Sequence, residues 1–247
     1  TAKDVADAAN KAAGQTVAHA TSTTKPQVIL ALDASGSMRG IEDAAQAQYT
    51  AIVDAVRTKM PTASVSALSF NSVVSEIKPV AVPQYPYCTG STSLLDAVVK
   101  LANSVTIDTP TLIYMITDGE ESGSAASQHD RSVIEAIAKL TKANNVTLAF
   151  VGPPAARSYL SRLGIPDTAC MTWDGGAASL IAKVVPKVVA GIEATATALK
   201  EGKKSLAHFF LDIDSVSLQD AAKKCVDVTS TMERRNTVQG GLAVREY

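Results

Sequence analysis

The sequence has few aromatic residues, few cysteines and almost no net charge, and each shortage narrows what the chain can be. Phe, Trp and Tyr make up 4% of the 247 residues, whereas 46% are hydrophobic, so the core must be mostly aliphatic. Such a core suits parallel strands that helices bury on both faces. The 23 basic residues nearly cancel the 24 acidic ones, and no basic run exceeds two residues. We therefore expect neither nucleic acid nor a membrane as a partner.

The three cysteines, Cys88, Cys170 and Cys225, are widely spaced and form no metal-binding pattern. We interpret them as free structural thiols in a reducing compartment, with a disulfide at Cys88 as the alternative. No apolar run reaches the length of about 18 residues that spans a membrane. A cytoplasmic location follows as the expectation. A virion or a secreted location stays an alternative, since the sequence begins at Thr1 without a methionine.

The segment after residue 27 carries the first sign of chemistry. Residues 28–32 are apolar and rich in β-branched side chains, which predicts a buried strand that ends where the polar run begins. Asp33, Ser35 and Ser37 follow at alternate positions and offer one carboxylate and two hydroxyls. Such hard oxygen donors suit Mg²⁺ better than zinc. The alternative is that the two serines only cap the following helix.

Two further motifs favour the metal site. Thr92 precedes a helical pattern, and Asp118 follows the apolar stretch 111–117 within Thr117-Asp118-Gly119. Ligands of an open α/β sheet gather at the carboxyl ends of strands, where the strand order reverses. If the strands that end at Asp33 and at residue 117 flank that reversal, Asp33 and Asp118 converge on one ion.

This ordered set of motifs resembles the metal-ion-dependent adhesion site (MIDAS) of von Willebrand factor type A (vWA) domains. The resemblance covers about residues 26–192 and includes all five motif positions. It implies that hydroxyls bind Mg²⁺ or Mn²⁺ directly or through water, that aspartates do so largely through water, and that a partner's carboxylate can take the open position. By this resemblance the metal residues are Asp33, Ser35, Ser37, Thr92 and Asp118.

The pattern of apolar segments predicts an α/β fold with a doubly wound, mostly parallel sheet, one short antiparallel edge strand and helices on both faces, as in Rossmann-like vWA domains. Strands are expected at 28–32, 65–70, 111–117, 146–151 and 168–173, with 73–77 as the antiparallel partner of 65–70. Helices are expected at 41–59, from 94, from 129, at 155–163 and at 177–192, and Pro186 should kink or divide the last one. We expect three regions: a helix (2–18) and linker in 1–25, a vWA domain in 26–202, and an extension in 203–247. In the extension, 206–213 suits a strand and 215–225 a helix, and a native chain that continues beyond Tyr247 stays an alternative.

The loops beside the site supply candidates for partner contact. Tyr85, Tyr87 and Glu120 are predicted to form a partner-binding rim. For the two tyrosines the alternative is packing of their loop onto the domain. Glu120 and Glu121 could also add negative charge beside the metal, and plain solvation is the alternative. His129 is interpreted as a helix-end residue.

The leading functional hypothesis is a noncatalytic module that captures an acidic residue of a protein partner at a Mg²⁺-occupied site. One alternative is a structural subunit of a larger intracellular or phage assembly, and we expect a bacterial or phage-type protein. Another alternative is a Mg²⁺-dependent hydrolase, which the motifs disfavour because no nucleophile–base pair, phosphate-binding lysine or glycine-rich phosphate loop accompanies them.

Overall fold

The computed structural model describes residues 24–119, 121–173, 176–206 and 209–210. The helix predicted over 2–18 and the helix predicted over 215–225 lie outside the described residues, as does most of the strand predicted over 206–213. The division of the chain into three regions therefore stays a prediction. In the part of the chain that is described, no helix is both long and apolar enough to cross a bilayer.

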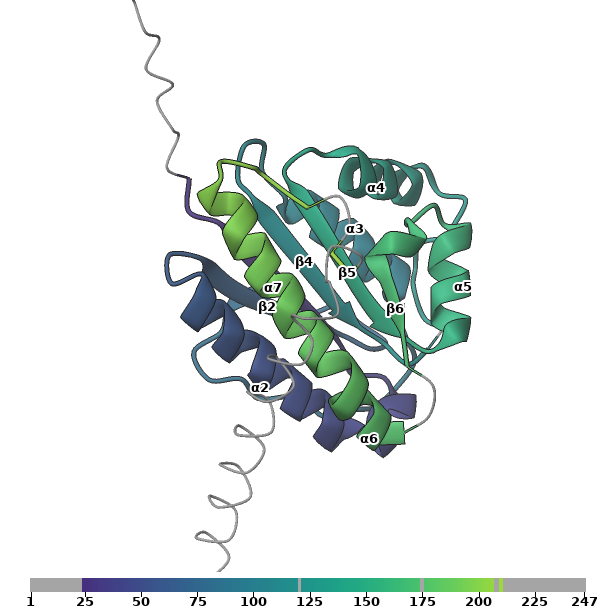
Figure 1. Cartoon of the computed structure of the whole chain (residues 1–247). Coiled ribbons are helices and arrows are strands. Elements are labelled where there is room, and N and C mark those ends of the chain that lie inside the picture. Colours follow the sequence, from purple (N-terminus) through teal and green to yellow (C-terminus); the bar gives the residue numbers. More distant parts are fainter. Residues whose placement is uncertain (1–23, 120, 174–175, 207–208, 211–247) are drawn as a thin grey trace, which may run out of the picture.

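A six-stranded sheet forms the centre of the molecule, with the strand order β3-β2-β1-β4-β5-β6 (Figure 1). All neighbouring strands are parallel except β2 and β3, which are antiparallel. The predicted fold class is thus confirmed. The strands are β1 (Gln27–Asp33), β2 (Ser64–Phe70), β3 (Lys78–Pro79), β4 (Thr111–Ile116), β5 (Val146–Gly152) and β6 (Cys170–Thr172).

Helices cover both faces of the sheet (Figure 1). Helices α2 and α7 pack on one face, and α3, α4 and α5 pack on the other. The helical segments are η1 (Gly36–Gly40), α2 (Glu42–Lys59), α3 (Leu94–Ser104), α4 (Arg131–Lys142), α5 (Pro154–Arg162), η2 (Asp167–Ala169), α6 (Gly176–Ser179), η3 (Leu180–Val184) and α7 (Val185–Lys200).

The central strands are apolar along their whole length because they are covered on both sides. In β1, Val28 and Leu30 face α2 and α7, whereas Ile29 and Ala31 face the helices of the other layer. All six residues of β4 are buried in the same way. This two-sided burial explains the long apolar runs that the sequence shows at these strands.

Two details of the fold differ from the expected elements or refine them. The antiparallel partner of β2 is Lys78–Pro79 and not 73–77, where Phe70 and Val74 form only an isolated bridge. Ser75 explains the difference, since its hydroxyl accepts a hydrogen bond from the Ser69 amide at 2.8 Å and occupies a donor that a strand would use. The division expected near Pro186 is confirmed: the π-helical segment η3 ends and α7 begins next to this proline.

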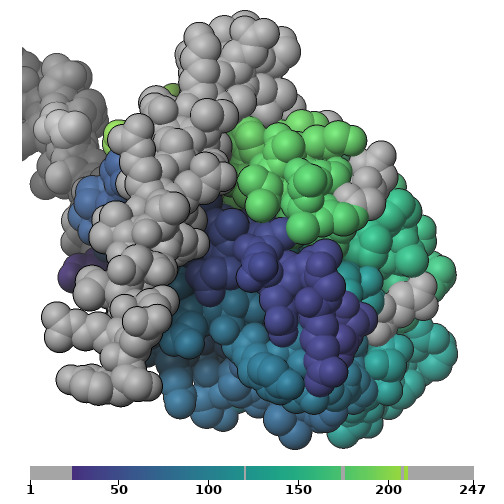
Figure 2. Space-filling view, turned by 90° about the horizontal axis from the view of Figure 1, so that it is seen from below, coloured from purple at the N-terminus to yellow at the C-terminus, as the bar shows by residue number. Residues whose placement is uncertain are grey.

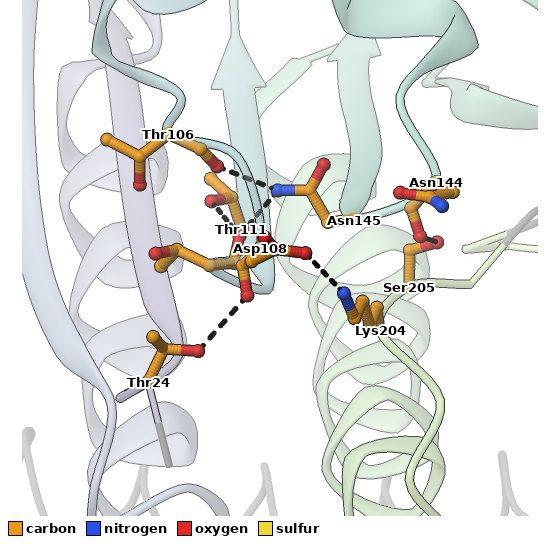
Figure 3. A network of polar contacts seen from close by, with 9 residues as sticks. Thr24, Thr106, Asp108, Thr111, Asn144, Asn145, Lys204 and Ser205 are labelled. Carbon is orange, nitrogen blue, oxygen red and sulfur yellow. Dashed lines mark hydrogen bonds and ion pairs between the residues drawn. The ribbon is translucent and has the colours of Figure 1, made fainter. Parts of the chain in front are cut away.

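The chain enters and leaves the sheet region at the amino ends of the strands (Figure 3). Thr24 donates its hydroxyl to the Asp108 carbonyl at 3.0 Å, and Lys204 pairs with the Asp108 carboxylate at 2.6 Å. Leu206 donates its amide to the Thr147 hydroxyl at 2.8 Å, at the start of β5. The opposite edge, at the carboxyl ends of the strands, is thereby left to the loops that carry the predicted site.

Candidate metal centre

Asp33 is the last residue of β1, and its side chain is fully buried. One carboxylate oxygen accepts the Ser35 amide at 2.8 Å, and the other accepts the Thr117 hydroxyl at 2.5 Å. Donors from the loops after β1 and after β4 therefore fix this carboxylate from two sides. Thr117 was not among the predicted site residues, although its place in the Thr-Asp-Gly motif was the signal that could have identified it.

Three more predicted residues join Asp33 through one chain of polar contacts. The hydroxyl oxygens of Ser35 and Ser37 lie 3.1 Å apart, and Ser37 donates to the Asp118 carboxylate at 2.8 Å. Ser37 and Asp118 are 81 residues apart in the sequence. They meet because β1 and β4 are neighbours at the point where the strand order reverses.

Two backbone hydrogen bonds hold the loop that leads to Thr92 against the loop after β1. The Thr89 amide donates to the Ala34 carbonyl at 2.7 Å, and the Gly36 amide donates to the Gly90 carbonyl at 3.0 Å. Gly90 has a φ of 78°, a left-handed conformation that favours glycine. The turn at Gly90 thus sets the path by which Thr92 reaches the site.

Thr92 completes the set from the side of α3. Its amide donates a hydrogen bond to the Ser122 hydroxyl at 3.0 Å, which ties Thr92 to the loop after β4. A Cβ atom built on Gly119 would lie 3.4 Å from the Thr92 hydroxyl oxygen and 3.8 Å from that of Ser37. Both hydroxyls therefore border the space beside Gly119. We call Asp33, Ser35, Ser37, Thr92 and Asp118 the oxygen cluster.

The spacing of the oxygen cluster fits a small divalent cation. An octahedral Mg²⁺ with bonds of about 2.1 Å places adjacent ligand oxygens about 3.0 Å apart. The Ser35–Ser37 hydroxyl separation of 3.1 Å matches this edge, and the Asp118 carboxylate oxygen lies 2.8 Å from the Ser37 hydroxyl. The Thr92 side chain is 4% exposed, and its hydroxyl has no hydrogen bond to the described residues. Among these same residues no group of three or more His, Cys, Asp or Glu side chains could hold a metal.

Burial dominates the electrostatics of the two aspartates. Desolvation raises the pKa of the Asp33 carboxyl, hydrogen bonds from Thr117 and Ser35 oppose the rise, and the charge of Asp118 adds to it. Desolvation also raises the pKa of Asp118, against the hydrogen bond from Ser37. The two carboxylates thus stand in a poorly solvated place, where a nearby positive charge would favour their ionised forms.

The two tyrosines of the predicted rim play different parts. Tyr85 donates its hydroxyl to the Asp33 carbonyl at 2.8 Å, and its ring stands edge-on to Tyr49 with centroids 6.5 Å apart. Tyr85 thus packs its loop onto the domain, and its contact with a partner stays a prediction. Tyr87 is 76% exposed, and the Arg39 guanidinium lies 5.8 Å from its ring centroid. Arg39 is held there by a 3.0 Å hydrogen bond to the Cys88 carbonyl.

The acidic loop after Asp118 is built around Glu121. Its carboxylate accepts the Leu95 amide at 2.8 Å, in the first turn of α3, and the amides of Gly123 and Ser124 at 2.8 and 2.6 Å. Glu121 therefore caps a helix and shapes its own loop, where a carboxylate is favoured by the helix dipole. Glu120, the third predicted rim residue, lies outside the described residues.

The remaining candidates lie as the sequence analysis expected. His129 is exposed just before α4, as a helix-end residue. Cys88 and Cys170 are buried free thiols, and Cys225 lies outside the described residues. Burial, with Glu42 beside it, raises the pKa of the Cys88 thiol to about 12. A thiol with this pKa is almost entirely protonated near neutral pH.

Figure 2 views the molecule from the lower end of Figure 1. The purple segment that follows β1 lies at the centre of this surface, between the blue-teal segment below it and the green of α6 and the start of α7 above it. Within the oxygen cluster, Ser37 is exposed, Asp118 is half-buried, and Asp33, Ser35 and Thr92 are buried. The cluster therefore has a buried floor and an accessible edge.

Comparisons with known proteins show a likeness of fold. The pilus adhesin SpaC from Lactobacillus rhamnosus GG, in its open conformation, matches with a TM-score of 0.50 and 12% identity over 73% of this chain and 31% of its own. A von Willebrand factor type A protein from Catenulispora acidiphila matches with a TM-score of 0.49 and 14% identity over 69% of this chain and 43% of its own. The ArnB paralog VWA2 from Sulfolobus acidocaldarius matches with a TM-score of 0.48 and 15% identity over 66% and 45%.

The chain spans less than half the length of each of these three proteins. No protein-family model and no curated protein matches the sequence. At identities of 12–15% the likeness concerns the fold alone.

Proposed function

We propose that the oxygen cluster binds one Mg²⁺ or Mn²⁺ ion and presents it to an acidic side chain of a protein partner, without catalysing a reaction. The observation that carries this proposal is the 3.1 Å separation of the Ser35 and Ser37 hydroxyl oxygens, which matches one octahedral edge, with the Asp118 carboxylate in contact with Ser37. The hydroxyls of Ser35, Ser37 and Thr92 would hold the ion directly. Asp33 and Asp118 would hold it through water.

The composition of the cluster supports capture of an external carboxylate. Mg²⁺ prefers six oxygen ligands and commonly keeps several waters. Three of the five cluster residues offer neutral hydroxyls, so the two aspartates alone balance the charge of the ion. When bound, the cation supplies a Lewis-acidic centre at the accessible edge beside Ser37. A partner's carboxylate that replaces one water there gains a charge-assisted contact.

Two exposed side chains beside the cluster are candidates for contact with the partner. We propose that Tyr87, with Arg39 stacked on it, forms the part of the rim that touches the partner. An exposed tyrosine and an arginine are the residue types that most often anchor interfaces. The hydrogen bond from Arg39 to the Cys88 carbonyl holds the pair in place before binding, which reduces the entropy lost on association.

The neighbourhood of the cluster supports a binding role more than a catalytic one. Among the described residues, the one histidine, His129, is an exposed helix-end residue, and no hydrogen bond joins it to the cluster. Cys88 is buried with its thiol protonated, so it lacks the lowered pKa of a nucleophilic cysteine. Asp33, the buried aspartate, has both oxygens engaged by donors. These features favour a cation that binds and does not turn over substrate.

Calorimetric titration of EDTA-treated protein with Mg²⁺ and Mn²⁺ tests the proposal. Thr92→Ala is the sharpest variant, because it removes a hydroxyl that has no hydrogen bond to described residues and should leave the fold intact. Thr89→Ala is the matched control, since Thr89 lies in the same loop and is exposed.

We expect one bound ion in the wild type and in Thr89→Ala, and at least a tenfold weaker Kd, about 1.4 kcal/mol, in Thr92→Ala. Absence of binding in the wild type, or equal binding in both variants, would contradict the metal site. It would then favour the alternative of an assembly subunit whose contacts need no cation.

A further inference from the structure

A groove runs between α4 and α5, in the helical layer opposite α2 and α7. It encloses about 530 Å³ and is bordered by His129 at the start of α4, Lys142 at its end, and Arg162 to Gly164 at the end of α5. Figure 1 shows both helices on the β5–β6 side of the molecule. None of the residues that border the groove belongs to the oxygen cluster.

The floor of the groove is aliphatic. Ile137 is buried in the core, and Ala138 and Leu163 are half-buried beside it. Ile134 is 55% exposed, although α4 buries Val133, Ile137 and Leu140 on its inner face. Ile134 therefore adds an aliphatic side chain that packing against the sheet does not require. The floor therefore offers aliphatic contacts to a side chain that enters the groove.

The charges around the groove have one sign. Its charged side chains are Lys142 and Arg162, both positive, and no acidic side chain among the described residues borders it. The Arg162 guanidinium lies 5.6 Å from the centroid of the Tyr159 ring, a stacking contact that limits its motion. Lys142 has no ion pair with another described residue. The positive side chains at the border of the groove can thus pair with acidic groups that the described part of the molecule does not supply.

We propose that this groove binds a short acidic peptide segment of a protein partner. An apolar side chain of the peptide packs on Ile134 and Leu163, and flanking carboxylates pair with Lys142 and Arg162. The twelve residues of α4 span about 18 Å, which matches five to six residues of extended peptide. A peptide is a better fit than a small molecule because the floor is partly exposed along its length. This second contact surface needs no metal.

Fluorescence anisotropy with the full chain tests the proposal. The probe is a labelled ten-residue peptide in which glutamates flank a leucine and a phenylalanine, and a peptide with glutamine in place of glutamate is its control. The variants are Lys142→Glu, Arg162→Glu and Ile134→Ser, all at exposed positions. Lys200→Glu is the matched control, because Lys200 is an exposed lysine in the last turn of α7 as Lys142 is in the last turn of α4.

We expect the acidic peptide to bind in the presence of EDTA, more weakly as salt is added, and the glutamine peptide to bind roughly tenfold more weakly. Lys142→Glu, Arg162→Glu and Ile134→Ser should each weaken binding roughly fivefold or more, while Lys200→Glu leaves it unchanged. A peptide with lysines in place of glutamates should bind the combined Lys142→Glu and Arg162→Glu variant.

Three results would overturn the proposal. The first is that neither peptide binds the wild type. The second is that Lys200→Glu weakens binding as much as Lys142→Glu, and the third is that Ile134→Ser has no effect. In either of the last two cases the binding would be unspecific charge attraction. Binding that EDTA abolishes would point to the oxygen cluster and not to the groove.

Discussion

Gly119 offers a direct way to test whether the hydroxyls of Thr92 and Ser37 share one ion. Its φ is not in the left-handed region, so alanine can adopt the same backbone conformation. The added Cβ would meet the Thr92 oxygen at 3.4 Å and the Ser37 oxygen at 3.8 Å, which are ordinary van der Waals contacts. We therefore expect Gly119→Ala to fold normally, and to gain about 0.4–1 kcal/mol if only the entropy of the unfolded chain changes.

Gly119→Ala should nevertheless weaken binding of the cation. The new methyl group would occupy space between two of the proposed ligands, where Mg²⁺ needs room for its inner-sphere waters. We expect at least a tenfold weaker Kd. At a Mg²⁺ concentration of 100 times the wild-type Kd, the ion stabilises the wild type by about 2.7 kcal/mol and the variant by only about 1.4 kcal/mol.

Calorimetric titration gives the Kd, and thermal unfolding with and without Mg²⁺ gives the stabilisation. Gly40→Ala is the control: Gly40 lies in η1 beside the cluster, its φ is also outside the left-handed region, and a Cβ there would meet nothing within 4 Å. If Gly119→Ala binds Mg²⁺ as tightly as Gly40→Ala, the space beside Gly119 does not hold the ion's ligand shell. If Gly119→Ala fails to fold, the packing argument is refuted.

Three further predictions concern the core, the thiols and turnover. Gln48 donates to the buried Tyr114 hydroxyl, while its own carbonyl oxygen has no partner among the described residues. Tyr114→Phe should therefore lower the free energy of unfolding by about 1–3 kcal/mol, and adding Gln48→Leu should restore most of this loss. Urea unfolding of the single and double variants checks this, and an additive loss in the double variant would contradict it. Burial raises the pKa of Cys88 to about 12 and that of Cys170 to about 11. Iodoacetamide at pH 8 should therefore alkylate both thiols far more slowly in native than in urea-unfolded protein, which peptide mass spectrometry measures. Rapid labelling of the native protein would mean that these sites open readily. Finally, Mg²⁺-loaded protein should hydrolyse p-nitrophenyl phosphate no faster than Asp33→Ala does, and metal-dependent turnover that this variant loses would replace the binding function with a catalytic one.

The loops around the site show where prediction from sequence stopped. The strand ending at Asp33 and the motif at Asp118 could be located because apolar runs and their polar ends are local features. The inward direction of the Tyr85 side chain could not be predicted, since it depends on a hydrogen bond to the Asp33 carbonyl, 52 residues away. The capping role of Glu121 likewise depends on the Leu95 amide from another loop. The sequence left two interpretations open for Tyr85 and favoured a solvated Glu121, because loop composition alone does not show which group a side chain contacts.

The sequence by itself indicated the order of strands and helices and the two-sided burial of β1 and β4, and the resemblance of its motifs to a known family predicted the five residues of the cluster. These depend on periodicity, composition and motif, which are properties of short segments. Only the tertiary structure decided that β1 and β4 are neighbours, and so that Ser37 lies 2.8 Å from Asp118. Only the structure also shows that the antiparallel edge strand is Lys78–Pro79 and that a groove lies between α4 and α5. The reason is that sheet order and helix packing arise from contacts between segments far apart in the chain, and no single segment encodes its neighbour.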